Sequence, residues 1–418
     1  VLTTNFKETV NFATFTPDNK MVYALTNIGR DKTALVLMDP ATCEEKEVLY
    51  TNDKYDISGL GYSELKKKLT SVSCTGHKGT IRHYFDKDEE AIRTKLEQKL
   101  EGYDINTTSE DKSENIRIIY AGGDRTYGTY YTYNVKEDKL TKIADLAPWI
   151  KEEDMVPMHP ITYTSRDGLT IEGYLPPPKG YTMENAKNLP VVVNPHGGPW
   201  ARDSWGYNPE VQFLANRGYA VLQMNFRAST GYGRKFTELG YKQWGQTMQN
   251  DITDGVEWLI KKGIADPKRV AIYGGSYGGY ATLAGVTFTP DLYACAIDYV
   301  GVSNLFTFMQ TIPPYWKPLL DMMYEMVGDP VKDKEMMEKY SPVFHVGQIK
   351  APLFIAQGAN DPRVNKAESD QMVEALKKRG IEVEYMVKDN EGHGFHNEEN
   401  KFDFYRAMEK FLDAHLKK

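Results

Sequence analysis

The stretch Arg269-Val-Ala-Ile-Tyr-Gly-Gly-Ser-Tyr-Gly-Gly-Tyr280 decides how the rest of the chain is interpreted. Its apolar half, residues 270–273, is typical of a buried β-strand, and the small residues after Tyr280 are typical of a helix start. Between them, Gly274-Gly-Ser-Tyr-Gly278 matches the G-x-S-x-G turn, which leaves little room for a Cβ at its glycines. The stretch therefore predicts Ser276 as a nucleophile at the end of a strand, beside a helix N-terminus that favours negative charge.

The alternative is a glycine-rich turn that binds phosphate. The dinucleotide fingerprint G-x-G-x-x-G does not fit, because Ser276 stands where the second glycine is needed. No G-x-x-x-x-G-K-[ST] motif occurs in the chain either. The nucleophile interpretation requires a carboxylate and then a histidine further along the sequence.

The bulk composition sets limits on the fold and on the partners. A chain of 418 residues is too long for one ordinary core, so two domains are expected. With 41% hydrophobic and 26% charged residues, the composition is that of a soluble globular protein. The net charge of -7 and the dispersed Lys and Arg argue against a nucleic acid partner. No apolar run reaches the roughly 18 residues of a membrane span, so no membrane partner is expected.

The three cysteines, Cys43, Cys74 and Cys295, are odd in number and far apart. This pattern argues against a disulfide framework or a zinc site, and it is compatible with a reducing compartment. No signal peptide is visible, so a cytoplasmic location is expected. The chain begins with Val1 rather than Met, which leaves open an upstream segment or signal.

Residues 1–150 are expected to form β-structure with a loose internal repeat. Short runs of β-branched and aromatic residues alternate with polar ones and are separated by turn residues. The expected strands are 21–25, 34–38 and 47–50, then 116–120, 129–133 and 140–143, with a poorer copy within 68–85 and a helix at 88–100. Such repeats suggest propeller blades, with a plain β-meander or sandwich as the alternative.

The number of repeats is too small for a complete propeller. A propeller typically has at least about four blades, and only about three fit here. An incomplete propeller leaves sheet edges exposed. Either the chain is a fragment, or the missing blades come from a partner or from another copy in a homo-oligomer.

Residues 151–418 show a different period. After a linker at 145–160, a hairpin is expected at 161–165 and 170–174, and strands then alternate with amphipathic helices. The strands are expected at 191–193, 220–224, 270–273, 296–300, 353–356 and 383–387, and the helices near 208–217, 248–262, 279–287, 366–379 and 402–416. Strands this apolar indicate a mostly parallel, doubly wound sheet covered on both faces.

Asp361 and His393 are the candidates that complete a triad with Ser276. Asp361 follows the strand at 353–356, where active-site loops lie, although an Asn-Asp-Pro turn is also common. His393 lies between two glycines after the last strand, where a plain surface histidine is the alternative. His396 could pair with His393 on a metal, but the nearby carboxylates make no recognised ligand spacing, and neither a metal nor a cofactor is expected.

Acyl transfer also needs donors for the oxyanion. One is expected to be the backbone N–H of Tyr277, the residue after the serine. The other is expected at Gly198, because an apolar strand opens there into His196-Gly-Gly, although a structural glycine turn is the alternative. His196 itself is expected to orient this loop rather than to act as a base.

Five segments in order resemble the prolyl oligopeptidase family of serine peptidases, most closely its acylaminoacyl-peptidase branch. They are His196-Gly-Gly-Pro199, Asn225-Phe-Arg-Ala-Ser-Thr-Gly-Tyr-Gly233, Gly274-Gly-Ser-Tyr-Gly-Gly-Tyr280, Gly358-Ala-Asn-Asp-Pro-Arg-Val364 and Gly392-His-Gly-Phe395. The resemblance implies an α/β-hydrolase domain preceded by a seven-bladed β-propeller. It also implies Ser276 as nucleophile, Asp361 as acid and His393 as base, with oxyanion donors at Gly198 and Tyr277.

The chain departs from the family pattern in two respects. Its repeats account for less than half a propeller, and Ala228 stands where glycine is usual. The His-Gly-Gly segment also resembles carboxylesterases of the hormone-sensitive-lipase type. The expected function is therefore a serine peptidase of short peptides that forms an acyl-enzyme, with a carboxylesterase of small acyl or aryl esters as the alternative. A non-catalytic scaffold is disfavoured because all three triad candidates are present.

The substrate-binding residues are the least determined by sequence. Trp200 and Tyr280 are candidates for an apolar pocket, as are Phe306, Phe308, Tyr315 and Trp316, although each is equally suited to the core. Arg227 or Arg363 is a candidate for binding a substrate carboxylate. Residues 301–340, rich in aromatic residues and Met, are expected to form an insertion over the site.

Overall fold

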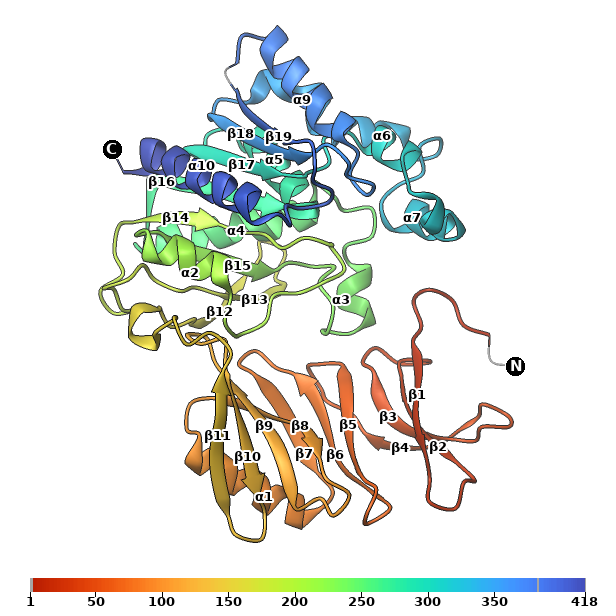
Figure 1. Ribbon diagram of the computed structural model, residues 1–418. Coiled ribbons are helices and arrows are strands. Elements are labelled where there is room, and N and C mark those ends of the chain that lie inside the picture. The colour runs from red at the N-terminus through yellow and green to blue at the C-terminus, as the bar shows by residue number, and fades with distance from the viewer. Residues whose placement is uncertain (1–2, 382, 418) are drawn as a thin grey trace. The chain divides into compact units, whose positions relative to one another are not determined.

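The structure is a computed structural model, and it describes residues 3–381 and 383–417 (Figure 1). The chain divides into two compact units. The β unit contains the described residues up to Met158, together with Ser204–Gln212 and Gly231–Lys235. The α/β unit contains His159–Asp203, Phe213–Thr230 and the described residues from Phe236 onward.

Three antiparallel sheets form the described part of the β unit (Figure 1). The first has the order β1-β2-β3-β4, the second β5-β6-β7 and the third β11-β10-β9-β8. Their bounds are β1 Val10–Phe15, β2 Val22–Thr26, β3 Ala34–Met38, β4 Glu45–Tyr50, β5 Ile57–Ser63, β6 Lys68–Thr75, β7 Thr80–Tyr84, β8 Asp104–Glu110, β9 Ile116–Gly122, β10 Thr129–Asn134 and β11 Lys139–Asp145. Each sheet is thus a run of consecutive hairpins, as the repeated strand pattern predicts.

Small separate cores hold these sheets together. In the first sheet, Val22, Ala24, Val36 and Met38 alternate with more exposed positions and bury one face. Helix α1 (Lys87–Lys99) packs Leu96 against Ile105, Ile119 and Tyr133 of the third sheet. The helix starts where the Asp86 carboxylate accepts a hydrogen bond from Asp88 N at 2.9 Å, which satisfies one of the unpaired donors of its first turn.

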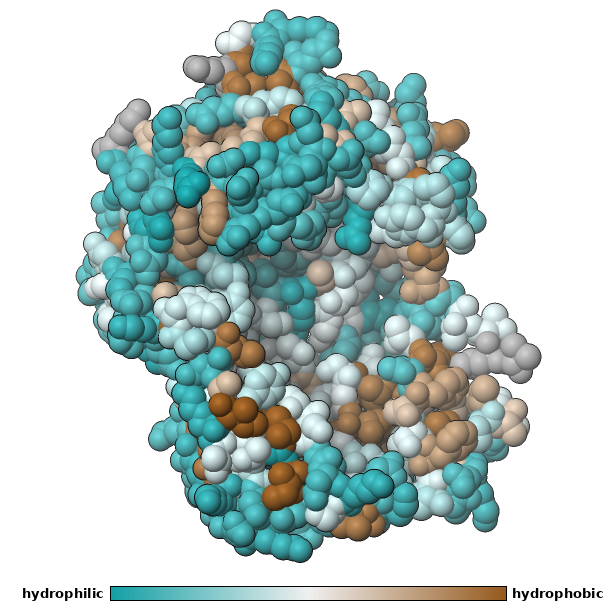
Figure 2. Space-filling model, viewed as in Figure 1, coloured by the Kyte–Doolittle hydropathy of each residue, from teal (hydrophilic) through white to brown (hydrophobic). Residues whose placement is uncertain are grey.

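Hydrophobic side chains also lie on the outside of this unit. Figure 2 shows them on its visible surface. Phe12 and Phe15 on β1 are each 51% exposed, and Trp149, just beyond β11, is 77% exposed. These residues lie on or next to the outermost strands of the first and third sheets, whose edges have no further strand in the described chain.

The α/β unit is built on an eight-stranded sheet with the order β12-β13-β15-β14-β16-β17-β18-β19. The bounds are β12 Pro160–Thr164, β13 Thr170–Tyr174, β14 Leu189–Val193, β15 Ala220–Asn225, β16 Ala265–Gly275, β17 Cys295–Tyr299, β18 Leu353–Gly358 and β19 Val383–Lys388. The hairpin β12-β13 joins antiparallel, and the pairs from β15 to β19 are parallel. This order confirms the predicted, mostly parallel sheet.

Helices cover both faces of this sheet. Those that pack on its strands are α4 Thr247–Lys261, α5 Tyr277–Phe288, α9 Lys366–Lys378 and α10 Glu398–Leu416. The other helices in this part of the chain are α2 Pro209–Asn216, α3 Arg234–Glu238, α6 Leu305–Gln310, α7 Leu320–Met326 and α8 Lys334–Lys339. On β16, Ile272 faces Gly285 of α5, whereas Tyr273 on the opposite face meets Phe404 of α10. Since successive strand residues alternate sides, α5 and α10 lie on opposite faces. None of the described helices is long and apolar enough to cross a membrane.

The segment between β17 and β18 contains the expected insertion. It folds into the short helices α6, α7 and α8, with 3₁₀ turns at Pro314–Leu319 and Pro342–Gln348, rather than into one continuous helix. Asn304 caps α6 by accepting from Phe306 N at 3.0 Å. Gly328, at φ +157°, follows the end of α7 and breaks the helical run. The insertion thus brings several apolar side chains near Ser276 at the carboxyl end of β16.

Candidate active site

Ser276 stands at the bend between β16 and α5. Its φ of +59° is a strained conformation for a residue with a Cβ, and its N–H donates to Tyr299 O at 2.9 Å. The turn depends on two glycines for space. A Cβ on Gly274 would lie 2.5 Å from Gly278 O, and one on Gly278 would lie 2.3 Å from Pro195 O. The bend holds the Ser276 side chain at the carboxyl end of the sheet.

Asp361, His393 and Ser276 form a continuous hydrogen-bonded chain. Asp361 follows β18, and His393 follows β19, so parallel neighbouring strands bring both loops to the same end of the sheet. His393 Nδ1 lies 2.7 Å from Asp361 Oδ2, and His393 Nε2 lies 3.0 Å from Ser276 Oγ. The Asp361 side chain is fully buried, whereas that of His393 is 16% exposed.

The hydrogen-bond partners of Asp361 determine the tautomer of His393. Its Oδ1 accepts from the N–H groups of Arg363 at 2.8 Å and Val364 at 2.9 Å, which orients the carboxylate. The other oxygen can only accept, so His393 Nδ1 carries the proton and Nε2 has a free lone pair toward Ser276. This arrangement can remove the serine proton and hold the resulting imidazolium.

The loop after β14 reaches the serine. A Cβ on Gly197 would lie 3.1 Å from Gly275 O and 3.6 Å from Ser276 Cβ, so this loop contacts the bend. Gly198, at φ +117°, and Tyr277 both line the pocket beside Ser276. The structure thus brings together the two residues predicted to supply oxyanion donors.

His196 is held inside this loop. Its Nδ1 lies 2.7 Å from Gly197 O and its Nε2 2.8 Å from Ser229 Oγ, and its ring stacks on Phe226 at 4.3 Å. Because a carbonyl only accepts, Nδ1 donates and Nε2 accepts from the Ser229 hydroxyl. Burial lowers the pKa of His196 to about 4, so the ring is neutral near pH 7. These contacts fit a residue that orients the loop.

Two residues that the sequence did not indicate anchor the His393 loop. Buried Glu391 accepts from His396 N at 2.9 Å and Asn397 N at 2.8 Å. Burial alone raises its pKa, but these bonds and those from the side chains of Asn397 and Asn400 prevail and lower it to about 2. Tyr299 Oη accepts from Phe395 N. Only the polarity of 389–391 hinted at such an anchor, because hydrogen bonds between distant residues leave no sequence pattern.

A pocket of about 480 Å³ opens beside Ser276 and His393. Its other lining residues are mostly apolar, and they come from the insertion and from the loops that hold the triad. They are Gly198, Trp200, Trp244, Tyr277, Val302, Phe308, Trp316, Leu319, Met322, Met323, Arg363 and Val364. An apolar cavity with few polar groups next to a nucleophile suits the side chain of a substrate.

Among the predicted substrate-binding residues, Trp200 and Arg363 line this pocket, and so do Phe308 and Trp316. Tyr280 and Arg227 are not part of its lining, which corrects the expectation that they contact a substrate. Tyr280 is fully buried, packs on Trp244 at 5.0 Å, and donates to Tyr340 O at 2.8 Å. Its aromatic side chain therefore serves the core.

Arg227 is committed to a buried ion-pair network. Its guanidinium donates to Asp251 at 2.7 and 2.8 Å and to Asp167 at 2.7 and 3.0 Å. Ser165 Oγ also donates to Asp251, at 2.7 Å. Burial opposes the charge of Arg227, but hydrogen bonds to these two carboxylates prevail and raise its pKa. The network ties β15 to α4 and to the β12-β13 turn.

The alternative of a metal pair at His393 and His396 finds no ligand set in the structure. Within residues 3–381 and 383–417, no group of three or more His, Cys, Asp or Glu side chains is placed to hold a metal ion. His393 Nδ1 and Nε2 are directed at Asp361 and Ser276 instead.

Known proteins resemble this chain in sequence. Residues 205–418 match the model of the prolyl oligopeptidase family, Peptidase_S9. Dipeptidyl aminopeptidase BIII of Pseudoxanthomonas mexicana is 40% identical over 406 residues, covering 95% of this chain and 58% of that protein. Dipeptidyl peptidase family member 6 of Caenorhabditis elegans is 35% identical, covering 96% and 57%. An acylamino-acid-releasing enzyme of Arabidopsis thaliana is 28% identical, covering 56% and 31%.

Solved structures share the fold. A puromycin-hydrolyzing peptidase of Mycobacterium tuberculosis aligns with a TM-score of 0.82 at 23% identity, covering 99% of this chain and 62% of that one. The acylaminoacyl peptidase of Pyrococcus horikoshii aligns with a TM-score of 0.74 at 21% identity, covering 96% and 62%. These likenesses confirm the predicted fold class, an α/β-hydrolase domain preceded by an all-β domain resembling part of a β-propeller. The chain spans a little under three fifths of the length of its two most similar relatives named above.

Proposed function

Because the chain belongs to the prolyl oligopeptidase family, we propose that it is a serine peptidase that hydrolyses short peptides through an acyl-enzyme intermediate. The observation that carries this proposal is the hydrogen-bonded chain from Asp361 through His393 to Ser276. The esterase alternative requires the same three residues, so the choice between them depends on the substrate pocket and on the family.

Acylation begins with the proton on Ser276. His393 Nε2 removes it as Oγ attacks the carbonyl carbon of the scissile bond, and the carbonyl oxygen becomes an oxyanion. The N–H groups of Gly198 and Tyr277 stabilise that oxygen. Asp361 stabilises the imidazolium while remaining ionised. The imidazolium then protonates the leaving amine, and the ester on Ser276 is left behind.

Deacylation repeats the same steps with water. His393 removes a proton from a water molecule, which attacks the acyl-enzyme carbonyl, and the oxyanion forms again between the same donors. Collapse of this intermediate releases the acid product and returns the proton to Ser276 Oγ. No other ionisable group is required.

The pocket supports a preference for a large apolar residue on the acyl side of the cleaved bond. Trp200, Phe308, Trp316 and Met323 provide apolar walls, and about 480 Å³ exceeds what a small side chain needs. Arg363 is the charged residue of the lining and is the candidate for a substrate carboxylate. The relatives that match nearly the whole chain are named for dipeptide release, which favours a free amino terminus two residues before the cleaved bond.

Three chromogenic substrates test the proposal on the 418-residue chain and on Ser276→Ala. They are Ala-Phe-p-nitroanilide, its N-acetylated form and p-nitrophenyl butyrate. We expect hydrolysis of the free dipeptide anilide, weaker hydrolysis of the acetylated form, and loss of all activity in Ser276→Ala. Preference for the acetylated form would assign an acylaminoacyl-peptidase activity instead. Hydrolysis of the ester alone would replace the peptidase with the carboxylesterase.

A further inference from the structure

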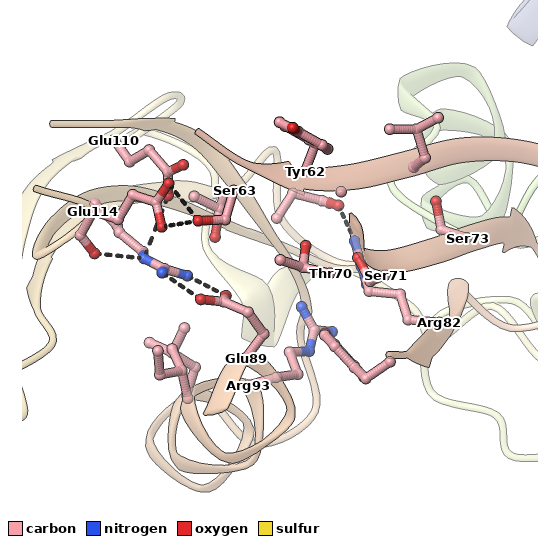
Figure 3. A pocket seen from close by; sticks show the side chains of 18 of the residues that line it. Tyr62, Ser63, Thr70, Ser71, Ser73, Arg82, Glu89, Arg93, Glu110 and Glu114 are labelled. Carbon is pink, nitrogen blue, oxygen red and sulfur yellow. Dashed lines mark hydrogen bonds and ion pairs between the residues drawn. The ribbon is translucent and has the colours of Figure 1, made fainter. Parts of the chain in front are cut away.

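A second cavity, of about 400 Å³, lies within the β unit and shares no residue with the Ser276 pocket. It is enclosed by the β5-β6-β7 sheet, helix α1 and strand β8 (Figure 3). Sheet faces that pack on neighbouring elements are normally apolar. The lining here is dominated by hydroxyl groups, arginines and glutamates, so ordinary core packing does not explain it.

Strand register places a small polar face toward this cavity. Gly61 pairs with Ser71, and Ser71 pairs with Tyr84; Ser73 pairs with Arg82 on the same face. A Cβ on Gly61 would lie 2.5 Å from Ser71 Oγ, so glycine leaves room for the hydroxyl. Residues this small cannot fill the gap between the sheet and α1, and the space therefore remains open.

Two arginines form one end of the cavity. Arg82 comes from β7 and Arg93 from α1, with side chains only 17% and 15% exposed. They share Asp104, whose Oδ1 lies 3.8 Å from Arg82 Nη1 and 3.9 Å from Arg93 Nη2. Buried Arg82 Nη1 has no hydrogen-bond partner among the described residues. Burial, and then repulsion by Arg93, lower the pKa of Arg82. Arg93 donates to Glu97 at 2.7 Å and to Ile105 O, so the donor without a partner at this end of the described cavity is Arg82 Nη1.

Glutamates gather at the other end, and Figure 3 shows Glu110 and Glu114 on the far side of the cavity from Arg82, with Glu89 on α1 beside Arg93. Arg117 is paired with Glu89, to which its guanidinium donates two hydrogen bonds of 2.6 and 2.8 Å. Glu114 accepts from Ser63 Oγ at 2.7 Å and Leu65 N at 3.0 Å. Glu110 lies 3.5 Å from Arg117 Nε. Three carboxylates thus surround one guanidinium, and this end lacks a cation.

The distance between the ends selects the length of a ligand. Arg82 Nη2 donates to Asn106, and Glu110 lies four residues further along β8, about 13 Å in an extended strand. The arginine and glutamate side chains extend inward from both ends and shorten this gap. An extended di- or tripeptide, at about 3.5 Å per residue, spans what remains.

We propose that this cavity binds a short zwitterionic peptide, with its carboxylate between Arg82 and Arg93 and its ammonium group at Glu110. The carboxylate would accept a hydrogen bond from the unpartnered Arg82 Nη1 and would offset the repulsion between the two guanidiniums. The hydroxyl groups of Ser71 and Ser73 face the peptide backbone between these ends. The site is independent of the chemistry at Ser276 and does not rest on the proposed function.

Calorimetric titration with triglycine tests the proposal, in the Ser276→Ala background so that the peptide stays intact. Triglycine amide lacks the carboxylate, and N-acetyltriglycine lacks the ammonium group. Because a hydrogen bond to a charged group contributes about 1.5–3 kcal/mol, we expect each change to weaken binding about tenfold or more. Absence of triglycine binding, or equal binding of either blocked peptide, would overturn the proposal.

Variants locate the site. Arg93→Gln is expected to weaken triglycine binding about tenfold or more, whereas Lys95→Gln, an exposed residue of the same helix, makes the same charge change and should leave it unaltered. Ser71→Met fills the cavity without changing charge and should also abolish binding. Thermal unfolding of each variant without peptide checks the fold. Equal losses in Arg93→Gln and Lys95→Gln, or full binding in a folded Ser71→Met, would contradict the assignment.

Discussion

At the residue scale, Asp361 controls which nitrogen of His393 carries the proton. An asparagine at 361 could keep the two backbone bonds from Arg363 and Val364 through its carbonyl oxygen, and it would then present an NH₂ group to His393 Nδ1. That group would favour the tautomer whose Nε2 is protonated and cannot accept from Ser276. The fold would be preserved while the base is lost.

We therefore expect Asp361→Asn to lower kcat on the peptide anilide by about 10⁴-fold with an unchanged thermal midpoint. Steady-state kinetics at saturating substrate, beside differential scanning fluorimetry, measures both quantities. A decrease of less than tenfold would mean that the 2.7 Å contact between Asp361 and His393 does not set the tautomer.

A second carboxylate near the nucleophile has no role in the proposed reaction. Asp298 lies on β17 opposite Gly274, is fully buried, and neither of its oxygens has a well-formed hydrogen bond among the described residues. Burial raises the pKa of Asp298 to about 7, and the nearby Gly301 N–H offsets only part of this effect. Its side chain lies against the first turn of α5, because a Cβ on Gly279 would meet Asp298 Oδ1 at 2.4 Å.

This raised pKa predicts a pH-dependent stability. The unfolded carboxyl loses its proton near pH 4 and the folded one near pH 7, so the free energy of unfolding falls as pH rises between these values. Asp298→Asn removes this dependence, and its stability relative to wild type should increase by about 4 kcal/mol from pH 4 to pH 7.5. Urea unfolding across that range measures the difference; parallel pH profiles would show that Asp298 does not titrate in this window.

At the scale of elements, the strand-to-helix bend depends on Gly278 more than on its neighbour Gly275. A Cβ on Gly278 would lie 2.3 Å from Pro195 O, whereas a Cβ on Gly275 would meet its nearest atom at an ordinary 3.5 Å. Gly278→Ala should therefore lower the free energy of unfolding by about 2 kcal/mol or more, and Gly275→Ala by less than about 1 kcal/mol. Equal effects of the two substitutions in urea unfolding would mean that this contact does not constrain the bend.

Whether a strand could be predicted from the sequence depends on how it is buried. Strands such as β14, β15 and β18 are fully or largely buried and mostly apolar because both faces are covered, so their sequences are easily recognised as strands. Strands β5 and β8 were not predicted. Strand β5 carries two glycines and β8 is largely polar, since both border the cavity between the second and third sheets. Hydrophobic periodicity cannot reveal a strand that faces a polar space.

The candidate site was also predicted only in part. The sequence predicted Ser276, Asp361 and His393 because each follows a stretch typical of a β-strand, and because the three occur in the order that this kind of triad requires. The pocket walls were only partly foreseen, because Met322, Met323 and Leu319 reach the site through the irregular helices of the insertion. Arg227 looked available in the sequence because its partners, Asp167 and Asp251, lie 60 and 24 residues away.

At the scale of the whole molecule, the β unit has three sheets in its described residues, and its outer strands expose large hydrophobic side chains. Unpaired strand edges with apolar side chains promote association. We therefore expect the 418-residue chain to self-associate, with a mass above 47.6 kDa at micromolar concentration. The double variant Phe12→Ser, Phe15→Ser should shift the chain toward monomer.

Light scattering after size exclusion, over a range of concentrations, checks this expectation. A matched control is Phe402→Ser, which is 50% exposed but lies on α10 of the other unit. A monomer at every concentration, or an equal shift in the control, would contradict a role of β1 in association. The cytoplasmic location stays a prediction, since nothing in the fold tests it.

Covalent labelling tests directly whether Ser276 is a nucleophile activated by His393. A fluorophosphonate reacts covalently with an activated serine, and peptide mapping by mass spectrometry identifies the modified residue. We predict one modification, on Ser276, which disappears in Ser276→Ala and slows by about 10³-fold or more in His393→Gln. An unmodified wild-type chain, or equal labelling of the His393→Gln variant, would contradict the account.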